Sequence, residues 1–151
     1  MTTARACTFL ALLLLIASPG MHAACTSGSL AGTFAFTTTG TLIVPNIGPV
    51  PVVAAGSITF DVNGNASGSQ DRSLGGQFAH ETIVGNISVT RDCVLNFVAN
   101  VYDSAGNLAR TSVITGVLAD HNKKIRAIFQ SIVLPDNTKL GSILSVDGDR
   151  L

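Results

Sequence analysis

Apolar and polar residues alternate along most of the chain, which is the period expected of half-buried β-strands. At 33–37, for example, the alternating positions place Phe34 and Phe36 on one face. No apolar repeat of 3.6 residues lasts long enough for a helix after the first 24 residues. Further strand segments are predicted at 57–62, 77–84, 87–90, 93–102, 108–118, 124–134 and 143–146.

Short turn sequences rich in Asn, Asp and Gly separate most of these segments. Connections of hairpin length join strands that pair antiparallel. An open meander of about eight strands would leave two unpaired edges, and closing the sheet removes both. We therefore predict an all-β, antiparallel, up-and-down closed β-barrel of about eight strands, with a β-sandwich as the alternative.

The segment "VPNIGPVPVV" at 44–53 departs from the short connections and holds three prolines. Proline has no N–H to donate to a strand ladder, so it is normally found at sheet edges or outside the sheet. The sequence here predicts a loop or a bent edge hairpin that lies across one mouth of the barrel.

Two copies of one pattern, an aromatic residue, Asp, two residues, Gly and Asn, begin at Phe60 and at Tyr102. The first copy has oxygen-bearing side chains at alternate positions, as calcium loops do. Its glycine is fourth, however, where an EF-hand loop has glycine sixth, and its twelfth residue is Arg72 rather than glutamate. We expect Asp61 and Asp103 to serve as turn residues, and we expect no metal site.

The N-terminus has the features of an export signal: Arg5, an apolar run at 9–17 and small residues before Cys25. We assign 1–24 to a signal peptide and 25–151 to a single barrel domain that is secreted or periplasmic. A lipid anchor at Cys25 is the alternative, although His22 stands where such a motif has an aliphatic residue. No membrane association is expected after the signal is removed.

Composition and charge narrow the range of partners. Charged residues make up 12% of the chain, and loss of Arg5 with the signal leaves eight basic against nine acidic residues, a net charge of −1. Nucleic-acid binding is therefore not expected, because it requires a basic surface. The sequence also holds none of the common phosphate-binding, zinc-protease or nucleophile-elbow motifs, and no cofactor is expected.

Two cysteines, Cys25 and Cys93, remain once the signal containing Cys7 is removed. Two cysteines in an exported chain usually pair. Their bridge would close a long loop, hold down the new N-terminus and stabilise the fold by about 3–4 kcal/mol.

Three polar residues within or at the end of predicted strands are candidates for ligand binding. His80 shares a face with Phe78 and either points inward or is a partly buried histidine satisfied by a neighbour. Arg126 alternates with Ile128, so it either anchors an anionic ligand inside the barrel or extends its head group into water. The outward reading is favoured because arginine is rarely buried. Tyr102 is the third candidate.

The first part of the chain resembles a calycin barrel, the group that includes lipocalins and avidins. The segment Leu30-Ala31-Gly32-Thr33-Phe34 is similar to their opening Gly-x-Trp strand, with Phe34 in the aromatic place. A bridge between Cys25 and Cys93 would be similar to the avidin disulfide. The tryptophans that hold biotin have no counterpart, so biotin binding is not implied. The mature chain also resembles short exported bacterial proteins of unknown function.

Three functions are compatible with such a chain. The first is an exported, non-catalytic barrel that binds a small apolar ligand, since small barrels are either filled by side chains or hold one ligand. The second is an isomerase- or cyclase-type enzyme that uses His80, Glu81, Tyr102 or Arg126. The third is a surface or matrix interaction protein with a solid barrel. The non-catalytic functions are favoured, and no oligomeric state is predicted.

Overall fold

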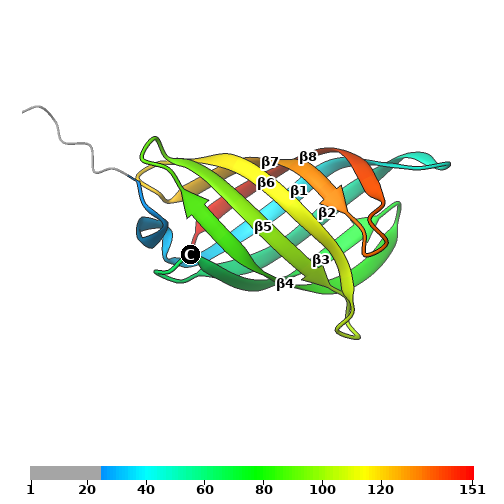
Figure 1. Cartoon of the computed structure of the whole chain (residues 1–151), viewed down its shortest axis with the longest axis horizontal. Coiled ribbons are helices and arrows are strands. Elements are labelled where there is room, and N and C mark those ends of the chain that lie inside the picture. The colour runs from blue at the N-terminus through cyan, green and yellow to red at the C-terminus, as the bar shows by residue number, and fades with distance from the viewer. Residues whose placement is uncertain (1–24) are drawn as a thin grey trace, which may run out of the picture.

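The computed structural model describes residues 25–151, so the predicted signal peptide lies outside the described residues. Eight antiparallel strands in sequence order form one closed barrel, which confirms the predicted fold class (Figure 1). The strands are β1 (Gly32–Val44), β2 (Gly48–Phe60), β3 (Asn65–Leu74), β4 (Gln77–Val89), β5 (Val94–Tyr102), β6 (Leu108–Ala119), β7 (Lys124–Val133) and β8 (Lys139–Arg150).

The barrel closes where β1 pairs with β8. The antiparallel register runs from Phe34 opposite Arg150 to Ile43 opposite Gly141. All the remaining strand pairs join strands that are neighbours in the chain. Each strand therefore has two partners, and no edge is left open. Successive residues of a strand then point alternately into and out of the barrel.

Several strands differ from those that the sequence pattern predicted, and β1, β2 and β8 are longer than the segments expected at 33–37, 57–62 and 143–146. The strand β3 was not predicted as a separate segment, because its inward positions hold mainly small or polar residues rather than β-branched ones. The segments predicted at 77–84 and 87–90 form one continuous strand, β4. The inward face of β4 is also the opposite of the expected one: Glu81 and Ile83 are buried, whereas Phe78 is exposed.

The proline-rich segment forms the tip of the hairpin between β1 and β2, in agreement with the hairpin alternative, but it does not lie across the barrel mouth. Both arms continue in the sheet and project beyond the neighbouring turns (Figure 1). The Pro51 carbonyl accepts a hydrogen bond from Gly75 N at 2.9 Å. The backbone carbonyl of Pro51 therefore faces the side where β3 ends. Because the proline nitrogen faces the same side, its lack of an N–H leaves no strand partner unsatisfied.

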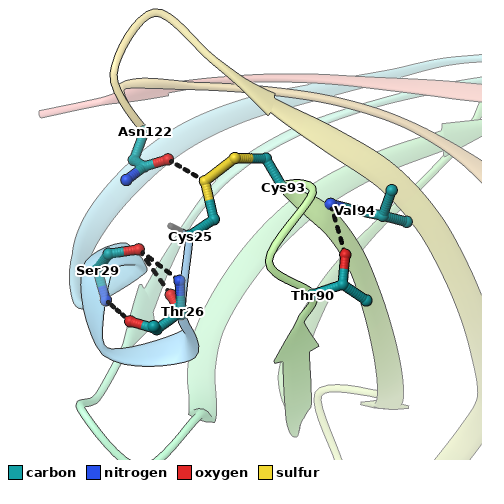
Figure 2. Close-up of a disulfide and its surroundings, with 7 residues drawn as sticks. All are labelled: Cys25, Thr26, Ser29, Thr90, Cys93, Val94 and Asn122. Atoms are coloured by element: carbon teal, nitrogen blue, oxygen red, sulfur yellow. Dashed lines mark hydrogen bonds between the residues drawn. A yellow bond between two sulfur atoms is a disulfide. The ribbon is translucent and has the colours of Figure 1, made fainter. Parts of the chain in front are cut away.

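The N-terminal segment covers one end of the barrel. A short 3₁₀-helix, η1 (Ser27–Leu30), is capped by Thr26 and Ser29, which exchange backbone and side-chain hydrogen bonds (Figure 2). The helix places Leu30 in the core with no exposed surface. A disulfide between Cys25 and Cys93, drawn in Figure 2, fastens this segment to the turn between β4 and β5 and confirms the predicted pairing.

The last strand also holds this end together. Arg150 donates hydrogen bonds to the carbonyls of Ala31 and Ser29, at 2.8 and 3.1 Å. Its guanidinium lies over the ring of Phe34, 4.9 Å from the centroid. The first and last strands and the 3₁₀-helix thus meet in one closed end.

The two copies of the repeated pattern form matching turns. Asp61 Oδ1 accepts hydrogen bonds from the backbone N–H groups of Asn63 and Asn65, and Asp103 does the same for Ala105 and Asn107. The side-chain and backbone hydrogen bonds from Asn65 hold the pKa of Asp61 below its usual value, and those from the backbone and side chain of Asn107 do so for Asp103. Gly64 and Gly106 have φ values of 85° and 83°, which glycine adopts without strain. In the described part of the chain, no helix is both long and apolar enough to cross a bilayer.

Loss of the disulfide should lower the free energy of unfolding by about 3–4 kcal/mol, because the bridge restricts the unfolded chain over a sequence separation of 68 residues. Urea unfolding of the protein with and without a reductant measures the difference. The variant carrying both Cys25→Ala and Cys93→Ala is the control: it should match the reduced protein and ignore the reductant. An unfolding midpoint that reduction leaves unchanged would contradict the structural role of the bridge.

Candidate binding site inside the barrel

Apolar side chains fill the end of the barrel that is closed by the disulfide. Phe34, Phe60 and Phe97 pack edge to face there, with ring centroids 5.8 and 5.9 Å apart. Leu30 and Leu95 complete the plug, and both are almost fully buried. This end is solid, so any interior space must lie further along the barrel axis.

A cavity of about 90 Å³ lies inside the barrel, and every strand contributes to its wall. Most of the lining side chains are apolar, and only Thr38, Gln70, Arg110 and Ser112 are polar. Its apolar wall includes Phe34, Val52, Ala54, Ile58, Ile83, Phe97, Ala99, Ile114, Ala127, Phe129 and Leu144. The cavity is therefore an apolar chamber with a few polar groups.

Two of these polar groups, Gln70 and Arg110, belong to a cluster centred on Glu81, which is 2% exposed. Arg110 binds this carboxylate through both terminal nitrogens, each at 2.7 Å. Arg72 donates from Nε to Oε1 at 2.9 Å, and Gln70 donates from Nε2 to Oε2 at 2.7 Å. A planar guanidinium facing a carboxylate in this two-pronged way makes a strong and well-oriented ion pair.

The strand register explains why these side chains meet. Gln70 on β3 lies directly opposite Glu81 on β4. Arg72 follows Gln70 by two residues and so shares its inward face. Arg110 on β6 pairs with Val101 on β5 and reaches Glu81 across the end of that strand. Three different strands therefore supply one cluster.

The cluster keeps Glu81 ionised. Burial raises the pKa of this carboxyl, but the hydrogen bonds and charge of Arg110, with the hydrogen bonds of Gln70 and Arg72, outweigh burial and lower the pKa to about 2. Two guanidinium groups face one carboxylate, so the cluster carries a net charge of +1. A carboxylate with so low a pKa is a weak general base.

Ser112 supplies a further polar atom. It follows Arg110 by two residues on β6, is 1% exposed and lines the cavity. Among the described residues, its Oγ is the buried side-chain oxygen or nitrogen that has no hydrogen-bond partner. Leaving a buried hydroxyl unpaired costs about 1–3 kcal/mol, so such an atom in a natural structure calls for a partner from outside the chain.

The three ligand-binding candidates from the sequence lie elsewhere. His80 is on the outer face, where its Nδ1 contacts Asp71 Oδ1 at 2.7 Å. Arg126 is also outside and pairs with Asp147 at 3.0 Å. Tyr102 is half-buried at the end of β5 and does not line the cavity. The expectation that His80 would supply a polar group to the interior was wrong, because β4 turns its odd-numbered residues inward.

The outward reading of Arg126 agrees with its position, beside Val117 and Ile128 in an open depression of the outer surface. Whether His80, Arg126 or Tyr102 binds a ligand at the surface stays a prediction. The set proposed for an isomerase or cyclase does not converge, since Glu81 lies inside the barrel whereas His80 and Arg126 lie outside.

Sequence reasoning missed Arg72, Arg110 and Ser112 as site residues, and it named Glu81 only as a candidate residue of an isomerase or cyclase. The alternation of β3, in which Gln70, Arg72 and Leu74 share a face, was the available signal. It could not be used without knowing that this face points inward.

Within residues 25–151, no group of three or more His, Cys, Asp or Glu side chains is arranged to hold a metal ion. No protein-family model matches the chain, and no curated protein or solved structure is significantly similar to it. The chemistry of the site is therefore inferred from its geometry.

Ionised Glu81 should make the fold sensitive to acid. Its pKa is about 2 in the folded barrel and 4.5 ordinarily, so its contribution is complete above pH 4.5 and is lost as the pH falls towards 2. The difference corresponds to about 3 kcal/mol. Urea unfolding between about pH 5 and about pH 2 should show a steeper loss of stability for the natural protein than for Glu81→Gln. Equal losses in both proteins would show that Glu81 does not titrate in this way.

Proposed function

We propose that this protein is an exported, non-catalytic barrel that binds a small, largely apolar ligand in its interior cavity. The observation that carries the proposal is the cavity itself, which is walled by apolar side chains from all eight strands and has a few polar groups. Binding sites for small molecules commonly combine an apolar wall with a small number of placed polar groups.

The two ends of the barrel differ in a way that supports an entrance at one of them. The disulfide end is filled by Leu30, Phe34 and Leu95, all nearly or fully buried. Near the opposite end, the Arg72 side chain keeps 18% of its surface exposed. Leu42, Val52, Ile132 and Leu144 are also buried at that end, so a ligand would enter beside Arg72, between the turns that follow β1, β3, β5 and β7.

The size of the cavity limits the ligand. Pockets for drug-sized molecules measure about 300–1,000 Å³, whereas this cavity is about 90 Å³. An apolar ligand of a few carbon atoms, or a single short alkyl chain, is the class that this space favours. The aromatic residues that line it are all phenylalanines, with no tryptophan or tyrosine among them.

We further infer export and a relationship to calycin barrels. The disulfide indicates an oxidising environment outside the cytoplasm, which agrees with the predicted signal peptide. Kinship with calycins is supported by the closed eight-strand meander and by Phe34, which occupies the core near the start of β1. A bacterial source, suggested by the likeness to short exported proteins, belongs to the same proposal.

A second candidate is an interaction protein that acts through its outer surface. Apolar side chains lie exposed on the outer face of β8, β1 and β2, where Ile143 is 73%, Ile43 41% and Val53 56% exposed. Exposed apolar surface of this kind often marks a contact site. This candidate requires no space inside the barrel, which separates it from the first.

Filling the cavity should abolish ligand binding without unfolding the barrel. Ala99 is 2% exposed and lines the cavity, so Ala99→Leu places a larger side chain there. With octanol as the probe at ten times its Kd, the natural protein should gain about 4 °C in melting temperature, and Ala99→Leu should gain none. Thermal unfolding measures both effects.

The matched control is Ala55→Leu, because Ala55 lies on the outer face of β2. It should respond to octanol as the natural protein does. If Ala99→Leu does not fold, Ala127→Val fills the same cavity with a smaller change. Absence of any octanol effect on the natural protein would refute the proposed function and leave the interaction protein as the better candidate.

A further inference from the structure

The charges inside the barrel are not balanced by the chain itself. Arg72 and Arg110 both bind Glu81, and the described residues place no second carboxylate in the cluster. The Arg72 and Arg110 side chains are largely withdrawn from water, with 18% and 14% of their surface exposed, and such a cation is costly unless a partner neutralises it. The cluster therefore leaves one positive charge for a group that the protein does not supply.

The unpartnered hydroxyl of Ser112 lies beside this excess charge. Ser112 and Arg110 are two residues apart on β6, point to the same side and both line the cavity. The Ser112 Oγ can rotate its hydrogen into the cavity and donate it. A hydrogen-bond donor and a net positive charge thus meet at one place on an otherwise apolar wall.

We propose that this polar end binds the carboxylate head group of an amphipathic ligand whose alkyl chain occupies the apolar cavity. Ser112 Oγ donates a hydrogen bond to the head group, and Arg110 with Arg72 supplies the attracting charge. The inference rests on the proposed function, because it names the class of ligand that the cavity takes.

The magnitude of the excess charge selects the head group. One carboxylate carries a single negative charge and neutralises a cluster of net charge +1. A phosphate monoester carries about −1.5 to −2 at neutral pH and would leave an uncompensated negative charge in the cavity. An amine would bring a second positive charge towards the cluster. A neutral alcohol would pair with Ser112 but leave the guanidinium charge unmatched.

Calorimetric titration with octanoate, octanol and octylamine tests the head group at constant chain length. We expect octanoate to bind at least about tenfold more tightly than octanol, as for a hydrogen bond or ion pair to a charged group. Octylamine should bind most weakly. Equal affinities for octanoate and octanol would overturn the carboxylate proposal and leave the proposed function standing.

Two variants of the cluster should change the affinity in opposite directions. Arg72→Met removes the excess charge but keeps the two-pronged pair between Arg110 and Glu81, so octanoate should lose about tenfold or more in affinity while octanol is unaffected. Glu81→Gln raises the net charge from +1 to +2, so octanoate should bind more tightly than to the natural protein. A cluster with a purely structural role would alter stability but not the preference for octanoate over octanol.

Ser112→Ala provides the third variant, because it removes the hydroxyl and leaves every ion pair in place. We expect a loss of about fivefold to tenfold for octanoate. Thr111→Ala, on the outer face of the same strand, is the matched control and should bind as the natural protein does. If neither octanoate nor octanol binds the natural protein, both this inference and the proposed function are wrong.

Discussion

The pairing of β1 with β8 is the interaction on which the rest of the structure depends. It turns a meander of hairpins into a barrel with no free edge, so that alternate residues of each strand face an enclosed interior. The same pairing places Arg150 over the ring of Phe34. From there its guanidinium donates a hydrogen bond to the carbonyl of Ala31, which directly follows the 3₁₀-helix. One end of the barrel is thereby sealed by side chains, and the disulfide fastens the N-terminal segment across it.

Closure also creates the chemical asymmetry of the interior. At the sealed end the inward positions hold aromatic and aliphatic side chains, whereas further along the axis β3, β4 and β6 turn Gln70, Glu81 and Arg110 inward. A closed sheet leaves these groups little contact with bulk water: the Arg72 and Arg110 side chains are 18% and 14% exposed, and Glu81 is 2% exposed. They therefore satisfy one another, and what remains unsatisfied is one positive charge and one serine hydroxyl. Our proposal of an amphipathic ligand follows from this unmatched charge and this unpaired hydroxyl.

The sequence was sufficient for the architecture but not for the site. Turn signals such as those at Asp61 and Asp103 divide the chain into hairpins, and hairpins without a second layer favour closure, so the barrel could be predicted. The strand β4 could not be oriented, because apolar residues lie on both of its faces: Phe78 and Val84 outside, Ile83 and Ile87 inside. The inward face of β4 follows only from its register with β3, which places Gln70 opposite Glu81. Charged residues are mostly exposed, so nothing in the sequence pattern singles out Arg72, Glu81 and Arg110 as inward-facing.

The central claim is that the buried charges serve binding rather than stability, and one unfolding experiment tests it directly. Removing a single partner from a buried ion pair is destabilising, whereas replacing the whole group by apolar residues of similar size is often neutral or stabilising. The protein carrying Gln70→Leu, Arg72→Met, Glu81→Met and Arg110→Met together should therefore have, in urea, a free energy of unfolding equal to or above that of the natural protein. A loss of about 3 kcal/mol or more in a variant that still folds would contradict the claim and make the cluster a structural element of the barrel.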